Sequence, residues 1–308
     1  MRNFGFYFSS NFSFLTKIMQ KNLFFLSLVS FLSLQLMAQT KPAYQLFDGN
    51  GKKVTYQYFV TNIAKKNIIF FGEQHNNAIA HWLELQITKD IFAEKKGNLM
   101  LGAEMFEADG QTIFEEFLEG KIPEKNFEKE MRLWDNYKTD YKPMVQFAVE
   151  KNLKFVATNI PRRYANLVFR EGLDGLNSLS TEAKKWIAPL PIEVDYKLHT
   201  YQEMLGGDEN AHTKEDFKFP SAQAIKDATM AHFILKNYKK EVTFIHFNGA
   251  FHTDFQEGII WYVKKKRSDL TVTNITTISQ DNMEQLDEKE LGRADFYLVV
   301  PTDMTTTY

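Results

Sequence analysis

Four apolar runs along the chain each end in a group of polar residues. The runs cover residues 67–71, 98–103, 154–158 and 242–247, and none of them alternates apolar with polar side chains. Such runs are typical of strands buried on both faces. Helical sequence separates successive runs, as the crossovers of a parallel sheet require. With two more strands expected over 272–278 and 296–300, the pattern predicts an α/β fold with a mainly parallel central sheet flanked by helices.

The helical pattern is concentrated in the middle of the chain. A helix is expected over 78–94, directly after the first run. Further helices make a largely helical insertion of about residues 107–240, with segments over 111–118, 127–134, 164–170 and 221–237. Residues 187–220 contain three prolines and are too long for a neutral connector, so they are expected to form a lid or a binding loop. At the start, residues 44–47 and 53–56 predict a β-hairpin, and a short helix is expected over 58–65.

The polar residues that end the runs are the first indication of a site. Ligands of open α/β sheets bind outside the carboxyl ends of the strands. If the four strands are parallel neighbours, one sheet edge collects several polar side chains: Glu73, His75, Glu104, Asn159, Arg162 and His252. Convergence of polar groups from separate segments is what a binding or catalytic site requires.

The N-terminus has the pattern of a secretory signal. Lys21 precedes an apolar run over 23–32, and small residues near Ala38 offer a cleavage point. We therefore expect a signal peptide over 1–38, with Met19 as an alternative start, and a single domain over 39–308. The apolar run is short for a membrane span. An uncleaved anchor is the alternative, and it would keep the protein at the membrane.

Composition narrows the functional classes. The chain of 308 residues has no cysteine, which excludes disulfides, thiolate metal sites and a lipid-modified cysteine after the signal. We therefore expect an exported protein, periplasmic or secreted, that is not a lipoprotein. A formal net charge of −2 gives no indication of nucleic-acid binding. Neither a Gly-x-Ser-x-Gly elbow nor a P-loop or dinucleotide fingerprint is present.

Four residues at the expected sheet edge are of the types that bind metals. Two imidazoles, of His75 and His252, and two carboxylates, of Glu73 and Glu104, could hold Zn, Mn or Fe with open positions. In a metal-dependent hydrolase, the histidines would bind the metal or activate water. The glutamates would act as ligand and general base. An equally good interpretation is a buried hydrogen-bond network behind the strand ends.

The remaining histidines and the tyrosines are less specific. His81 is expected to be a helix-face histidine with satisfied hydrogen bonds, and a ligand role is the alternative. His246 is expected in the core, and His199, His212 and His232 mostly at the surface. Tyr137, Tyr141 and Tyr164 lie in the insertion, where a phenolate could ligate ferric haem. Arg162 and Arg163 could pair with haem propionates. Ordinary packing is the alternative for each tyrosine.

Five blocks in order along the chain resemble the ChaN-type haem-binding uptake family. The blocks are Gly72-Glu73-x-His75-x5-His81-x4-Gln86, Gly102-x-Glu104-Met105-Phe106 with Gln111, Asn159-Ile160-Pro161-Arg162, Ala222-Gln223-x3-Asp227-x-Thr229-Met230-Ala231 and Gly249-x-x-His252. They extend over nearly the whole chain after residue 44. The resemblance adds Gln223 and Asp227 to the candidate binding residues.

The resemblance implies an exported α/β protein that binds haem for iron acquisition. It also implies haem held near a homodimer interface and ligated through a tyrosine. The superfamily is similar to Tiki metalloproteases and erythromycin esterases, which would use Glu73, His75, Glu104 and His252 for hydrolysis. The expected partners are thus haem or an iron-loaded small molecule and a second copy of the chain. No nucleic acid is expected, nor a membrane span after signal cleavage.

Overall fold

The computed structural model describes residues 41–205 and 217–308. The expected signal segment over 1–38, the alternative start at Met19, His212 and part of the irregular stretch 187–220 lie outside the described residues. Ala43–Tyr308 forms one compact unit. Within the part of the chain that is described, no helix has the length and apolar character needed to cross a bilayer.

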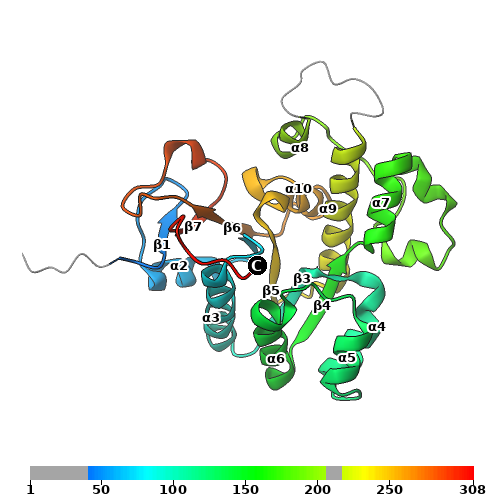
Figure 1. The fold of residues 1–308 in the computed structure, drawn as a ribbon, viewed down its shortest axis with the longest axis horizontal. Coiled ribbons are helices and arrows are strands. Elements are labelled where there is room, and N and C mark those ends of the chain that lie inside the picture. The colour runs from blue at the N-terminus through cyan, green and yellow to red at the C-terminus, as the bar shows by residue number, and fades with distance from the viewer. Residues whose placement is uncertain (1–40, 206–216) are drawn as a thin grey trace, which may run out of the picture. The chain divides into compact units, whose positions relative to one another are not determined.

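A seven-stranded sheet lies at the centre of this unit, in the order β1-β7-β6-β2-β5-β3-β4 (Figure 1). Its strands are β1 Gln45–Asp48, β2 Ile68–Glu73, β3 Leu99–Glu107, β4 Lys154–Asn159, β5 Thr243–Gly249, β6 Val272–Ser279 and β7 Phe296–Val300. All neighbours pair in parallel except β1, which is antiparallel to β7. The predicted α/β fold with a mainly parallel sheet is therefore confirmed.

The four strands that end in candidate site residues are neighbours in the order β2-β5-β3-β4. In the pairing of β2 with β5, Glu73 lies opposite Gly249. The pairing of β3 with β4 shifts its register between Ala103 and Glu107. Such an irregularity changes the direction in which a side chain points, and Glu104 lies within it. The strand ends thus meet at one edge, as the sequence predicts.

The helices cover the sheet and make up most of the segment between β3 and β5. Their bounds are α2 Tyr56–Ile63, α3 Ala78–Glu94, α4 Gln111–Leu118, α5 Glu124–Glu130, α6 Lys142–Lys151, α7 Arg162–Glu171, α8 His199–Met204, α9 Lys218–Asn237 and α10 Ile259–Lys266. The long helix α9 is buried over most of its length and packs against β4, α7 and α10 (Figure 1). It carries Gln223 and Asp227 to the sheet edge.

Two local expectations differ from the structure. The predicted hairpin forms only its turn, because Thr55 caps α2 and Lys53 makes a single bridge to Phe47. β1 pairs instead with β7, which is distant in the sequence. The helix expected over 127–134 ends at Glu130, where Met131 becomes extended. Trp134 therefore lies in the loop before a π-helical turn, Tyr137–Tyr141.

Candidate functional site

Glu73 and His75 form one half of the polar cluster at the sheet edge. Glu73 ends β2 and is buried, and His75 follows in the turn before α3. His75 Nδ1 lies 2.7 Å from Glu73 Oε1, and the Tyr141 hydroxyl donates to the same oxygen over 2.7 Å. Burial disfavours the charged form of Glu73. The His75 hydrogen bond and the His81 charge outweigh burial, so the pKa of Glu73 lies below its usual value.

Glu104, His252 and Asp227 form the other half. His252 lies in the turn after β5, with its Nε2 3.2 Å from Glu104 Oε1 and its Nδ1 in close contact with Asp227 Oδ1. The backbone N–H of Gly249 donates to Glu104 Oε2 over 2.8 Å. The Gln223 side-chain amide lies 3.0 Å from His252 Nδ1. All four side chains are buried. His252 therefore has a buried carboxylate partner on each of its ring nitrogens.

The electrostatics of this half favour an ion-paired histidine. Burial lowers the pKa of His252, but the charges of Glu104 and Asp227 raise it to about 9. Burial likewise opposes ionisation of Glu104, yet the His252 charge holds the pKa of Glu104 below its usual range. A protonated imidazole has no lone pair for a metal. Metal binding through His252 would therefore require it to lose its proton and a carboxylate contact.

Gly249 lies between the two halves of the cluster, beside His75 of one half and Glu104 of the other. A Cβ built on Gly249 would lie 2.8 Å from His75 Nε2 and 3.6 Å from Glu104 Oε2. The glycine therefore leaves the space into which the His75 ring packs, beside Glu104. His75 is the more accessible residue of the cluster, with 34% of its side chain exposed.

A third group of residues extends the cluster towards α3. His81 and Glu84 lie in the first two turns of α3 and are buried, as is Asp140 of the π-helical turn. His81 Nδ1 lies 3.5 Å from Glu73 Oε2 and 3.3 Å from Glu84 Oε2. His81 thus lies on α3 with buried carboxylate partners. The i,i+3 spacing of His81 and Glu84 is the signal that could have indicated the pair.

A groove open to the surface lies beside this cluster. Two adjoining cavities, of about 440 and 420 Å³, share Leu133, Trp134 and Arg162 in their walls. Asp135, Asn136 and Tyr308 complete the first cavity, and Glu107, Arg132 and Arg163 complete the second. We call the two together the Trp134 groove. The Trp134 ring packs edge-on against His75, with 4.8 Å between ring centroids, so the groove borders the accessible side of the cluster.

The predicted tyrosines occupy different places. Tyr137 and Tyr141 are buried in the main core, and the Tyr137 hydroxyl has no hydrogen-bond partner among the described residues. Tyr164 is half-buried, and its hydroxyl accepts from Arg163 over 3.2 Å. Arg163 is also paired with Asp109 at 2.7 Å. Tyr308 lines the groove with an exposed side chain, and sequence reasoning did not select it.

The other candidate residues lie outside the cluster. His246 is fully buried in β5, where its Nε2 contacts Thr158 and its Nδ1 contacts Asn248, as expected of a core histidine. His199 is exposed, and His232 is partly exposed. Asn159 ends β4 with a buried side-chain oxygen that has no hydrogen-bond partner in the described part of the chain.

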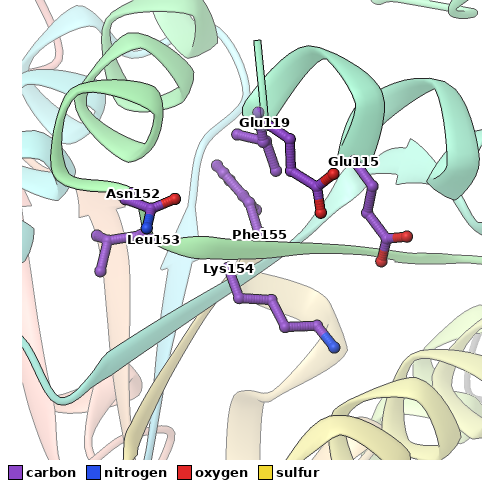
Figure 2. A pocket seen from close by; sticks show the side chains of 7 residues that line it. Glu115, Glu119, Asn152, Leu153, Lys154 and Phe155 are labelled. Carbon is purple, nitrogen blue, oxygen red and sulfur yellow. The ribbon is translucent and has the colours of Figure 1, made fainter. Parts of the chain in front are cut away.

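Another pocket, of about 310 Å³, lies at the start of β4, where Glu115, Glu119 and Lys154 surround it (Figure 2). Lys154 is the first residue of β4, so this pocket is at the opposite end of the strand from the candidate site. Its walls contain charged side chains but no histidine. It therefore does not belong to the polar cluster.

Comparison with known proteins places this fold in a family. A family model described as haem-binding uptake, Tiki superfamily, ChaN matches residues 59–263. The chain belongs to this family. The matched region contains every residue of the polar cluster, while Tyr308 lies beyond it. No curated protein matches the chain.

Solved structures resemble the chain in fold. One is the ChaN of Campylobacter jejuni, described with cofacial haem binding. It is 15% identical with a TM-score of 0.61, over 85% of this chain and 98% of that chain. A succinoglycan biosynthesis protein is 11% identical with a TM-score of 0.48, over 80% and 90% of the two chains. A Bacillus cereus protein is 11% identical with a TM-score of 0.46, over 79% and 90%.

Proposed function

We propose that this chain binds haem in the Trp134 groove. Membership of the haem-binding uptake family supports this class of ligand. The observation that carries the proposal is the composition of the groove, which joins an indole and a leucine to an arginine, Arg162, that both cavities share. Haem has a flat apolar ring and two carboxylates, so it matches a groove with an apolar wall and arginines. Cavities of this size are usual for small-molecule sites.

Arg162 is the cation best placed for a propionate. Arg132 and Arg163 are already paired with Asp109, and Arg132 also with Glu107. Arg162 is exposed and has no carboxylate partner within the described residues. Arginine binds carboxylates through two parallel hydrogen bonds, so Arg162 can take up a new carboxylate without breaking an ion pair. Arg163 would have to share its charge between Asp109 and the ligand.

Two side chains of the types that ligate haem iron lie at the groove. Tyr308 lines it with an exposed phenol, and His75 touches Trp134 with an accessible ring. Tyrosine and histidine are both established iron ligands in haem proteins. Tyr137 and Tyr141 would have to leave the core to reach the iron. We therefore place Tyr308 ahead of Tyr137, Tyr141 and Tyr164 as the phenolate ligand.

Titration of haemin into the purified protein tests this proposal. A saturable shift of the Soret band is expected, with affinity reduced at least about tenfold in Arg162→Ala, since a charged hydrogen-bonded pair contributes about 1.5–3 kcal/mol. Tyr308→Phe should alter the position of the Soret band, because it removes the phenolate from the iron. His75→Ala should leave the band in place, because Tyr308 and not His75 is the proposed iron ligand.

Matched variants control for surface charge and aromatic content. Arg170→Ala removes an exposed arginine of the same helix, and Tyr58→Phe alters an exposed tyrosine of α2. Both should bind haemin as the wild type does. The absence of a saturable shift, or equal losses in Arg162→Ala and Arg170→Ala, would contradict haem binding in this groove.

We further propose that haem draws two copies of the chain together. The Campylobacter jejuni ChaN is described with cofacial haem binding. Two haems that lie face to face need two binding surfaces, and the Trp134 groove is open to solvent on one side. Haemin should therefore shift the protein from monomer to dimer in sedimentation experiments. A haem-loaded monomer at high concentration would contradict this part of the proposal.

Export and iron acquisition complete the proposed role. The expected signal peptide over 1–38 supports delivery to the periplasm or the medium, and the family description supports uptake. Fractionation of cells that express the full chain, with N-terminal sequencing of the product, tests export. Growth of a deletion strain on haem as its iron source tests the role in acquisition.

A second candidate function is hydrolysis by the polar cluster. The array of Asp227, His252 and Glu104 beside His75 favours it, because buried charged pairs at a cleft are typical of acid–base catalysis. Elemental analysis of the purified protein, with His75→Ala and His252→Ala variants, tests a metal-dependent version. Stoichiometric Zn or Mn that is lost in both variants would support hydrolysis, and its absence would count against a metal centre there.

A further inference from the structure

The end of β2 and the start of α3 enclose a small group of buried ligand-type atoms. The group consists of Glu73, His81 and Glu84, each of which offers one ligand atom, and these atoms lie within 4.8 Å of one another. Each residue is at most 5% exposed. This group differs from the Glu104–His252 pair, and it uses the oxygen of Glu73 that faces away from His75.

The distances fit a coordinated ion. His81 Nδ1 lies 3.5 Å from Glu73 Oε2 and 3.3 Å from Glu84 Oε2. Ligands about 2.1 Å from a tetrahedral ion are separated by roughly 3.4 Å. The imidazole nitrogen therefore already lies at ligand spacing from an oxygen of each carboxylate.

One oxygen atom of each carboxylate has no hydrogen-bond partner among the described residues. Glu73 Oε2 and Glu84 Oε1 are buried and accept no hydrogen bond from any described residue. A buried carboxylate oxygen without a donor is costly. A cation bound between the two carboxylates would satisfy both oxygens.

The surroundings of His81 orient it as a ligand. Its Nε2 lies 3.1 Å from the backbone oxygen of His75 and 3.5 Å from Asp140 Oδ2. In the metal-bound state, an Nε2–H that donates to this carbonyl or carboxylate would leave the Nδ1 lone pair for the ion, as is usual behind metal-bound histidines. The ion would take the place of the Nδ1 proton. Tyr141 and His75 hold the other oxygen of Glu73 in place. Each ligand thus has a supporting contact.

We propose that Glu73, His81 and Glu84 bind a divalent ion of the Mn²⁺ or Zn²⁺ type that has a structural role. One imidazole and two carboxylates suit these ions. The site is enclosed, so a substrate has no access to the metal. The ion would join the end of β2 to the first turns of α3 and fix the loop that carries His75. This proposal is independent of haem binding.

Chelator-stripped full-length protein gives the test. Addition of Mn²⁺ or Zn²⁺ should raise the melting temperature saturably, with one ion bound per chain by elemental analysis. His81→Gln and Glu84→Gln should each weaken binding of that ion at least about tenfold. Glu84→Gln keeps the shape of the side chain, so it should fold and lack only the response to metal.

Glu104→Gln is the matched control, since Glu104 belongs to the neighbouring His252 pair. It should retain the ion and the metal-dependent rise in melting temperature. A proton shared by Glu73 and Glu84 is the competing explanation. It predicts no bound ion, no response to metal and an undiminished melting temperature in Glu84→Gln. That result would overturn the proposal, as would metal binding that depends on Glu104 as strongly as on Glu84.

Discussion

Tyr141 donates a hydrogen bond to the same oxygen of Glu73 that contacts His75 Nδ1. This contact joins the π-helical turn of the insertion to the end of β2, 68 residues earlier in the chain. The ring of Tyr141 also lies edge-on to His81 and to Trp134. One buried phenol therefore supports the cluster, the proposed metal ligand and the wall of the groove.

Tyr141→Phe should reduce the free energy of unfolding by about 1–3 kcal/mol, because a buried carboxylate loses a donor. Burial and the charge of Glu73 raise the pKa of Tyr141, so its hydroxyl remains a neutral donor. Urea unfolding measures the loss. Tyr56→Phe is the control, since its hydroxyl donates to the exposed Asp90 and should matter less. Equal losses in the two variants would show that burial does not strengthen the Glu73 contact.

The same variant separates support from iron ligation. If Tyr141 only supports Glu73, the haemin complex of Tyr141→Phe should keep the Soret band of the wild type. A changed band would support the other interpretation of Tyr141 in the sequence, that of an iron ligand.

The stability of the fold should fall as pH rises towards 9. His252 has a pKa of about 9 in the folded chain, against 6.5 without partners. Its ion pairs are therefore fully present below about pH 6.5 and are lost as pH rises through about 9. Denaturant midpoints measured across this window test the effect. The decline should be smaller in His252→Gln.

The parts of the fold that the sequence predicts are those with local signals. Continuous apolar runs indicate the parallel strands, and α3 has the expected bounds, Ala78–Glu94, with Asn77 accepting from two backbone N–H groups at its start. The convergence of Glu73, Glu104 and His252 follows from the rule for strand ends. Most of their partners do not follow from this rule, because contacts such as Glu73 with Tyr141 and Glu104 with His252 join residues far apart in the chain.

Contacts of the C-terminal segment had no local signal. Thr307 donates from its backbone to Asn76 and from its hydroxyl to Asp140, 167 residues away, which brings Tyr308 to the groove.

Tyr137 and Tyr141 are candidate iron ligands because of their residue type alone. A phenol packs equally well in a hydrophobic core, so only the packing of the insertion decides between iron ligation and a core position.

Gly249→Ala should damage the cluster by displacing His75. The backbone angle φ of Gly249 is −56°, which any residue can adopt, so only the new Cβ matters. That Cβ would lie 2.8 Å from His75 Nε2. Overpacking of this kind costs about 1–3 kcal/mol, and thermal or denaturant unfolding measures the loss.

A double-mutant cycle isolates the clash. In the His75→Ala background, Gly249→Ala should cost less than about 0.5 kcal/mol, because the ring that it meets is gone. The same cost in both backgrounds would mean that the alanine disturbs Glu104 or the backbone and not His75.

Gln111 should protect the outer edge of the sheet. β4 is the last strand, and the Gln111 side chain accepts from Ala157 N over 2.6 Å and donates to Phe155 O over 3.2 Å. It therefore replaces a missing neighbouring strand at two backbone groups of the edge. Gln111→Ala leaves both groups unpaired and should cost about 1–3 kcal/mol. Hydrogen exchange should accelerate at the Ala157 amide, whereas Gln146→Ala, at an exposed position, should change neither quantity. An unchanged Ala157 exchange rate would show that water or a neighbouring side chain takes the place of Gln111 at this edge.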